Sequence, residues 1–208
     1  MTPVQETSPS ITKLDMAASN TDQHPWDAGT ILSFWFEATR PNQWFHQNNQ
    51  FDQGIRQRFG NLCDQAQQGH LETWAQHPEG SLALVLLLDQ FSRHVWRGSA
   101  RAFAGDTRAV ALSLDAVHRG WIDQEPRRVR RQFWLMPFLH SEALTVQSEG
   151  VELMGRYADS ATTAVAQRHR DLIRRFGRFP HRNAVLQRTN TPDEELYLKA
   201  HQRRSDRP

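Results

Sequence analysis

Near the middle of the chain runs Leu82-Ala83-Leu84-Val85-Leu86-Leu87-Leu88-Asp89-Gln90-Phe91-Ser92-Arg93-His94. The seven apolar residues at its start are compatible with a buried strand, but Phe91 and Val95 continue the apolar pattern at helical spacing. We therefore predict a central helix over residues 79–94. Because its first half is apolar all round, this helix should be packed on every side.

The rest of the chain carries helix signals and almost no strand alternation. Proline, glycine and capping residues divide it into predicted helices at residues 27–39, 51–68, 107–119, 126–136, 141–157, 161–176 and 191–200. N-caps are expected at Asp27, at Asp106 or Thr107 and at Ser141, with a capping box from Thr191 to Glu194. The connections are short, so neighbouring helices should pack antiparallel. The sequence predicts an all-α array of helical hairpins in a single domain, with no repeat of fixed period.

The ends of the chain differ from its centre in composition. Residues 1–25 are rich in Thr, Ser, Pro, Gln and Asp without periodicity, which predicts a flexible extension. We expect one all-α domain over residues 26–202 and a tail over 203–208. The single cysteine, Cys63, excludes an internal disulfide and should fill the core. No apolar run reaches the roughly 18 residues of a membrane span, and no targeting signal is legible, so we predict a cytoplasmic protein without membrane contact.

Basic residues concentrate in the second half of the chain. Seven basic and ten acidic residues lie in 1–104, against eighteen basic and thirteen acidic residues in 105–208. The densest run is Arg127-Arg128-Val129-Arg130-Arg131. Asp123 and Glu125 precede it, so we interpret the run as a solvated helix face and do not expect nucleic-acid binding.

Charged side chains on apolar helix faces are the first candidates for a functional site. Asp89 and Arg93 extend the apolar face of the central helix. An inward Asp89 needs a partner, and Arg93, four residues later, can supply one. His169 lies on the apolar stripe of the helix at 161–176. A purely structural interpretation also exists: a buried ion pair for the first two, and a hydrogen-bonded core histidine for the third.

The segment that follows the helix at 161–176 holds further candidates. Arg178, His181 and Arg182 are interleaved with Phe179 and Pro180. Aromatic and proline anchors would pin this backbone and fix where the guanidinium groups point.

His140-Ser141-Glu142 is the third polar group. Ser141 as a cap and Glu142 in the first helical turn are explained by helix-end energetics, which leaves His140 over. Convergence of these residues with the other histidines would suit a divalent metal, but no tight histidine pair is present, so we predict neither a metal nor a cofactor. The candidate ligand-binding residues are Asp89, Arg93, His140, Glu142, His169, Arg178, His181 and Arg182.

Several of these segments resemble the bacterial domain-of-unknown-function family numbered 924. The resemblance spans about Ile31 to Leu198, and its most specific segment is Arg175–Asn183. His94 stands where the family pattern leads us to expect Asn, and Gln187 where we expect Gly. The resemblance implies an all-helical fold of the tetratricopeptide-like superfamily, and it implies no known reaction. The other matching segments are Phe34–Phe36, Trp44–Phe45, Leu88–Phe91, Arg93, Arg97–Gly98, Ala102–Ala104, Asp106, His140–Glu142 and Gln147.

Three functions fit these observations. In the first, the arginine and histidine side chains line a pocket that binds a small anionic molecule or an acidic peptide end. In the second, the same pocket belongs to a hydrolase-like enzyme, in which a histidine oriented by Glu142 or Asp89 is the general base. In the third, the polar groups only hold the helices together in an interaction scaffold. A histidine bonded to a carboxylate and open to a cavity would favour the second.

Overall fold

The central apolar stretch is a helix, as its spacing predicts. It consists of three consecutive parts, α4 (Pro78–Val85), the π-helical segment η3 (Leu86–Phe91) and α5 (Ser92–Val95). Every residue from Leu82 to Leu88 is at most 2% exposed, so this helix is packed on every side. The sequence does not predict the π segment, because the periodicity of so few residues cannot separate an α turn from a wider one.

The structure is a computed structural model that describes residues 27–45 and 47–205, and only the backbone of 202–205. The predicted extension at 1–25 lies outside the described residues. Within the described ranges there are helices and no strands, which confirms the all-α prediction. None of the described helices is long and apolar enough to cross a membrane. The remaining helices are α1 (Ala28–Ser33), π-helical η1 (Phe34–Ala38), α2 (Pro41–Phe45), α3 (Asn49–Gln67), 3-10 helices η2 (Glu72–Gln76) and η4 (Ala100–Phe103), α6 (Asp106–His118), α7 (Trp121–Gln124), α8 (Arg128–His140), α9 (Leu144–Tyr157), α10 (Ser160–Phe176), 3-10 helix η5 (Pro180–Arg182) and α11 (Pro192–Ser205).

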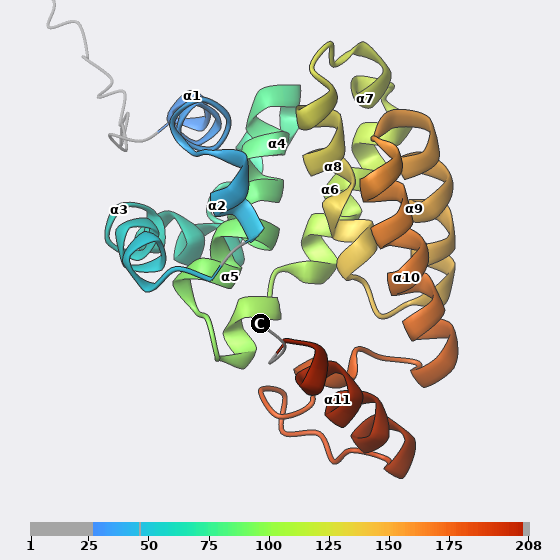
Figure 1. The fold of residues 1–208 in the computed structure, drawn as a ribbon. Coiled ribbons are helices and arrows are strands. Elements are labelled where there is room, and N and C mark those ends of the chain that lie inside the picture. Colours follow the sequence, from blue (N-terminus) through green and yellow to red (C-terminus); the bar gives the residue numbers. More distant parts are fainter. Residues whose placement is uncertain (1–26, 46, 206–208) are drawn as a thin grey trace, which may run out of the picture.

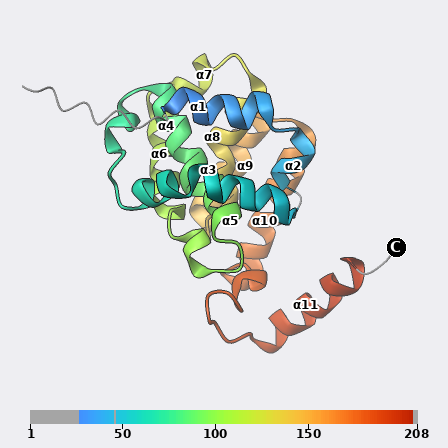
Figure 2. The same cartoon turned by 90° about the vertical axis from the view of Figure 1, so that its left-hand side faces the viewer.

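The central helix lies between two groups of helices (Figure 1). On one side α1 packs against α4, and α3 packs against η3 and α5. On the other side α6 and α8 contact α4, and α9 and α10 follow outward as neighbours of α8 and of each other. Figure 2 shows α11 projecting from this body, and its main packing partner is η5. The arrangement brings residues from α6, α8 and η5 close to the π segment.

Several helix ends agree with the sequence. Asp27 caps α1, since its Oδ1 accepts the Thr30 N–H at 2.8 Å. Gly177 ends α10 in the left-handed conformation, with φ 71°. At α11, Glu194 Oε2 accepts the Thr191 N–H at 2.7 Å and Thr191 Oγ1 accepts the Glu194 N–H at 3.3 Å, which is the predicted capping box.

Other helix ends differ from the prediction. Gly105 is the N-cap residue of α6, so Asp106 lies inside the helix and its side chain is free for other contacts. The N-cap residue of α9 is Ala143, so the prediction that Ser141 caps this helix is wrong. α8 does not end before Pro137 but continues through it, buried in the core, to His140. α2 and α7 were not expected, and α11 runs on through Ser205 into the predicted tail.

Candidate functional site

Asp89 is fully buried in the π segment and is held by three neighbouring side chains. Its carboxylate accepts from His140 Nδ1 at 2.7 and 2.9 Å, pairs with Arg93 Nη2 at 3.1 Å, and accepts from the Gln90 amide. Burial by itself would raise the pKa of Asp89, but Arg93 and His140 hold it well below its usual range. Asp89 is therefore ionised, and its carboxylate fixes the positions of the Arg93 guanidinium and the His140 imidazole.

A second carboxylate continues this arrangement. Asp106 binds Arg93 through two hydrogen bonds, from Nη1 at 3.0 Å and Nη2 at 3.2 Å. It also accepts from Arg182 Nη1 at 3.3 Å. Burial raises the pKa of Asp106, against the opposing effect of Arg93. The result is a continuous row of five side chains, which we call the polar row: His140, Asp89, Arg93, Asp106 and Arg182.

Arg182 ends the polar row and is incompletely bonded. The residue is only 6% exposed, and its guanidinium carbon lies 4.6 Å from the ring centres of both Phe103 and Phe179. Nη1 donates to Asp106, whereas Nε is buried and donates to no residue in the described part of the chain. Burial lowers the pKa of Arg182, and the like charge of Arg93 lowers it further. A buried guanidinium with an open donor would gain free energy from an additional anion.

His140 ends the polar row at the other side. Burial lowers the pKa of His140 more than Asp89 raises it, so the imidazole is neutral at neutral pH. An ionised carboxylate only accepts hydrogen bonds, so the proton lies on Nδ1 and points at Asp89. Nε2 then carries a lone pair, and no side chain or backbone N–H of the described ranges donates to it. This arrangement of a histidine and a carboxylate is the geometry of an oriented base.

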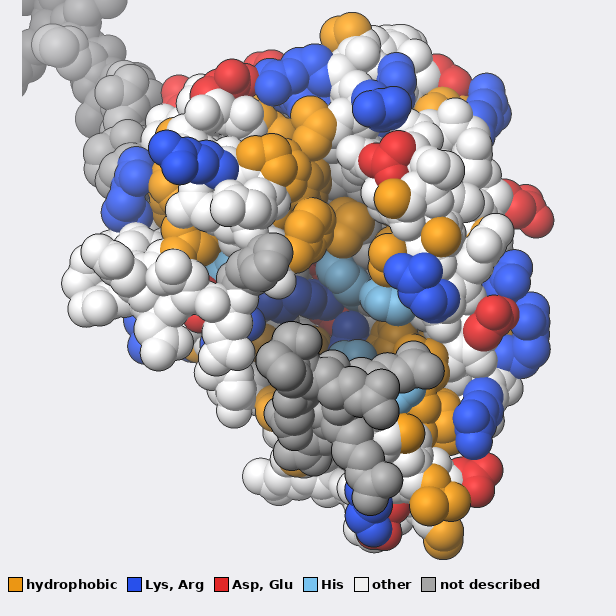
Figure 3. All heavy atoms as spheres, viewed as in Figure 1, with side chains coloured by type: hydrophobic (Ala, Val, Ile, Leu, Met, Phe, Trp, Pro, Cys, Tyr) orange, Lys and Arg blue, Asp and Glu red, His pale blue; other side chains and the backbone are white. Residues whose placement is uncertain are grey.

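Both ends of the polar row open into one pocket of about 570 Å³. Its polar lining includes Asp106, His140, Glu142 and Arg182. The space-filling view also shows arginine and histidine side chains gathered in a hollow between the α3 and α10 sides of the molecule (Figure 3). The apolar lining of the pocket is made by Ala100, Phe103, Ala104, Val110, Ala143, Val146 and Leu186.

Glu142 lines this pocket but is occupied by the loop that follows α10. Its Oε1 accepts the Phe179 N–H at 2.8 Å, and its two oxygens bind Arg188 at 2.7 and 3.0 Å. Against the opposing effect of burial, Arg188 lowers the pKa of Glu142. The prediction that Glu142 lies in the first turn of a helix is wrong, because it precedes α9. Its contacts instead position Phe179, one of the two rings against Arg182.

His169 and His181 both contact the ring of Phe179. Their ring centres are 5.2 and 5.4 Å from the Phe179 ring centre. His169 is partly buried, and its Nδ1 is 2.9 Å from the Leu139 carbonyl. Desolvation lowers the pKa of both histidines, and Arg182 lowers both further. They border the polar row without a hydrogen bond to any of its members.

Arg178 is not brought to the polar row. Its Nε and Nη2 bind the two oxygens of Glu194 at 2.7 and 2.8 Å, and Nη2 also donates to the Thr189 carbonyl at 2.8 Å. This pair connects the end of α10 to α11. The structure therefore unites Asp89, Arg93, His140 and Arg182 and places Arg178 at a helix junction.

Sequence reasoning missed three residues of the site. Asp106 was interpreted as a possible helix cap, because capping and ion pairing favour the same side chain. Arg188 lies in a loop without periodicity, so no sequence signal identifies it as the partner of Glu142. The only sequence signal at Phe103 is that it belongs to a segment that resembles the family, and no pattern predicts that its ring covers Arg182.

A second histidine and carboxylate pair lies on the opposite side of the central helix. His94 Nδ1 is 2.7 Å from Asp52 Oδ1, and Arg97 also binds Asp52. His94 is almost fully buried, with ring contacts to Trp35 and Phe51. Burial lowers the pKa of His94. Since this imidazole is enclosed by the core, we interpret the pair as a connection between α3 and α5.

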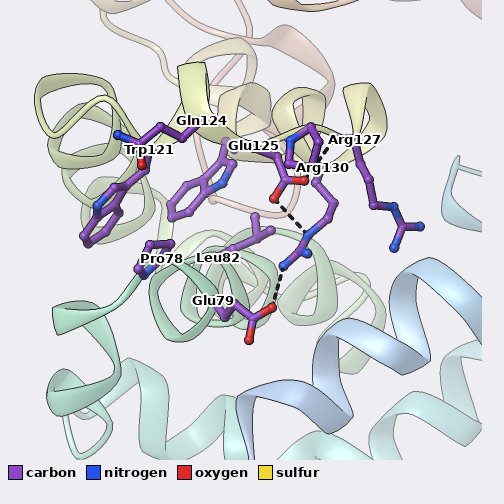
Figure 4. Close-up of a pocket in the computed structure, with 10 residues that line it drawn as sticks. Pro78, Glu79, Leu82, Trp121, Gln124, Glu125, Arg127 and Arg130 are labelled. Atoms are coloured by element: carbon purple, nitrogen blue, oxygen red, sulfur yellow. Dashed lines mark hydrogen bonds and ion pairs between the residues drawn. The ribbon is translucent and has the colours of Figure 1, made fainter.

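A smaller pocket of about 330 Å³ lies between α4 and the segment before α8. Figure 4 shows the Arg130 guanidinium between two carboxylates, with Glu125 at 3.3 Å and Glu79 at 3.6 Å. Trp121 and Trp134 line the same pocket, with ring centres 6.2 Å apart. Two protein carboxylates flank the cation of this pocket and no histidine among the described residues lines it, so we place the candidate site at the polar row, where His140 and Arg182 line one pocket.

Two similarities connect the chain to known proteins. The model of a family described as bacterial protein of unknown function (DUF924) matches residues 31–202. The solved structure of a protein of unknown function from Agrobacterium tumefaciens has a TM-score of 0.78 and 37% sequence identity, over 83% of this chain and 97% of that chain. No curated protein matches the chain. The two similarities confirm the resemblance and the fold, and neither names an activity.

Proposed function

We propose that this chain, which belongs to the DUF924 family of bacterial proteins of unknown function, binds a small anionic molecule at Arg182 and His140. The anion is a carboxylate or phosphate compound, or an acidic peptide end. The observation that carries the proposal is the buried guanidinium of Arg182, which lines a pocket and, beside the bonded Nη1, has an Nε without a hydrogen-bond partner among the described residues. Arginine forks match the geometry of such anions.

The surroundings of Arg182 support a binding role. The guanidinium of Arg182 packs against the rings of Phe103 and Phe179, and Glu142 with Arg188 fixes the backbone of Phe179. A donor that is fixed before the ligand arrives loses little conformational entropy on binding.

A second candidate function is catalysis, and His140 is the observation that favours it. Its Nδ1 is bonded to a buried carboxylate and its side chain borders the pocket. In this candidate the enzyme is hydrolase-like, and His140 Nε2 takes a proton from water while Asp89 stabilises the resulting imidazolium. A substrate screen in which the wild type is active and His140→Asn is inactive would establish it.

The proposed domain covers residues 26–202, and we propose a cytoplasmic location for it. Nucleic acid is not proposed as a partner, because two arginines of the short arginine run are paired with carboxylates. Arg127 pairs with Glu37, and Arg130 pairs with Glu125.

The test is a thermal-shift screen with phosphorylated metabolites and dicarboxylates, followed by calorimetric titration of each hit. Arg182→Met keeps a side chain of similar volume against the two phenyl rings and removes the charge. We expect it to weaken binding about 10-fold or more, the effect of a charge-assisted hydrogen bond. Arg178→Met is the matched control, since it removes an arginine of the same loop that binds Glu194 instead. Equal binding by wild type and Arg182→Met, or no binding of any anion, would favour the scaffold.

A further inference from the structure

The charge balance of the site limits the charge of its ligand. In the polar row, two carboxylates face two guanidinium groups, and Glu142 is paired with Arg188. Arg182 and Arg188 each have an Nε without a hydrogen-bond partner among the described residues, and of the two only Arg182 lines the pocket. Each further negative charge has to be held in a partly buried place, where an unpaired charge costs free energy. A monoanion such as a carboxylate fits this balance better than a phosphate dianion.

The pocket walls are more apolar than an ion site requires. Phe103, Val110, Val146 and Leu186 line the pocket and are only partly buried, so they leave apolar surface facing it. Covering such surface with an alkyl chain is favourable, at about 25 cal/mol per Å². An inorganic anion would leave it exposed to water. The walls therefore favour a ligand with an apolar body.

His140 sets a third requirement. Because Asp89 holds the Nδ1 proton, Nε2 presents an acceptor, and a ligand group that faces it has to be a donor. A carboxylate or an alkyl chain supplies no donor at neutral pH. A hydroxyl group does, and it satisfies the open lone pair of His140.

We infer that the ligand is a hydroxylated alkyl carboxylic acid, whose carboxylate binds Arg182, whose hydroxyl donates to His140 Nε2, and whose chain lies against Phe103 and Val146. The inference rests on the proposed anion-binding function and adds the identity of the ligand class. It requires one donor and one anion on the same small molecule, which separates it from binding of phosphate or of simple fatty acids.

Calorimetric titration with 3-hydroxyoctanoate, octanoate and 1-octanol tests the hydroxyl contact and the carboxylate contact separately. We expect 3-hydroxyoctanoate to bind about fivefold more tightly than octanoate, the ratio given by one net hydrogen bond. In His140→Asn this ratio should fall to one, because the Asn amide reproduces the Nδ1–H donor to Asp89 and removes the Nε2 acceptor. In His169→Asn, a histidine outside the polar row, the ratio should persist.

The role of the carboxylate is read from the other ligand pair. Octanoate should bind more tightly than 1-octanol to the wild type, and this preference should vanish in Arg182→Met. Equal affinities of 3-hydroxyoctanoate and octanoate would overturn the inferred hydroxyl contact. Anion binding would still stand if octanoate binds more tightly than 1-octanol to the wild type and not to Arg182→Met. Tighter binding of inorganic phosphate than of either acid would overturn the inferred hydroxyl contact as well. Equal binding of octanoate and 1-octanol by the wild type, or an undiminished preference for octanoate in Arg182→Met, would overturn anion binding at Arg182 itself.

A measurement on the wild type keeps the test decisive if His140→Asn fails to fold. In the ¹⁵N NMR spectrum of the imidazole, the Nε2 resonance of His140 should move when 3-hydroxyoctanoate is added and stay unchanged with octanoate. A resonance that moves equally with both ligands, or with neither, would contradict the hydrogen bond from the hydroxyl.

Discussion

Asp89→Asn should destabilise the fold strongly, because it removes the negative charge from the middle of the polar row. Asp89 is fully buried and binds Arg93 at 3.1 Å and His140 at 2.7 Å. Breaking a buried ion pair by neutralising one partner costs about 3–5 kcal/mol. For a chain of this length, each kcal/mol lowers the melting temperature by about 2–4 °C, so the total shift is about 6–20 °C. Urea unfolding followed by circular dichroism measures the free energy, and a thermal melt measures the temperature.

The control for this experiment is an exposed ion pair. Asp64 pairs with Arg101, and both side chains are more than a third exposed. Asp64→Asn should therefore change the free energy of unfolding by about 0–1 kcal/mol. If Asp89→Asn falls in this same small range, Asp89 is not the buried anchor that its contacts indicate, and the reasoning for the polar row is refuted.

Three further predictions concern packing, pH and backbone strain. Gly150→Ala should lower the free energy of unfolding by about 1–3 kcal/mol, because the added Cβ would lie 2.6 Å from the Cβ of Phe138. Gly155→Ala in the same helix meets nothing within 4 Å and should raise the free energy of unfolding by about 0.5–1 kcal/mol. Equal changes for the two variants in urea unfolding would contradict this. The pKa values of His94, His140 and His169 are lowered from 6.5 by burial, so their contribution to the free energy of unfolding is complete above pH 6.5 and is lost as the pH falls below it. Urea unfolding measured from pH 8 to pH 5 should show this loss of stability. A free energy of unfolding that does not change with pH would contradict neutral buried imidazoles. Gln187→Gly should raise the melting temperature, with a gain of about 0.5–1 kcal/mol, because Gln187 adopts φ 53°, which glycine tolerates; an unchanged or lower melting temperature would show that no strain is relieved.

The parts of the fold that depend on local chemistry could be predicted from the sequence. The central helix, the caps at Asp27 and Gly177 and the capping box of α11 follow from spacing and from residue type. The pair of Asp89 and Arg93 follows in the same way, since four residues separate them on one helix face.

Local sequence patterns do not predict that the side chains of the polar row come together, because its contacts join elements that are distant along the chain. His140 lies 51 residues from Asp89, and Arg182 lies 76 residues from Asp106. Which of several arginines reaches the row depends on how α10 and η5 pack, and no periodicity encodes this. Arg178 and Arg182 stand four positions apart in similar surroundings, yet one binds Glu194 and the other enters the site.

The widened turn at Leu86–Phe91 constrains how this chain tolerates insertions and deletions. Asp89 reaches His140 at the end of α8, and His94 reaches Asp52 on α3, so one helix is attached to both halves of the molecule. Removing a single residue upstream, at Leu86–Leu88, would rotate everything beyond it by about 100°. Asp89 and His94 would then turn away from their partners together, although no contacting residue had been replaced. The contacts to both halves thus depend on the rotation of this one helix about its axis. A change in the length of the helix should disrupt both sets of contacts together.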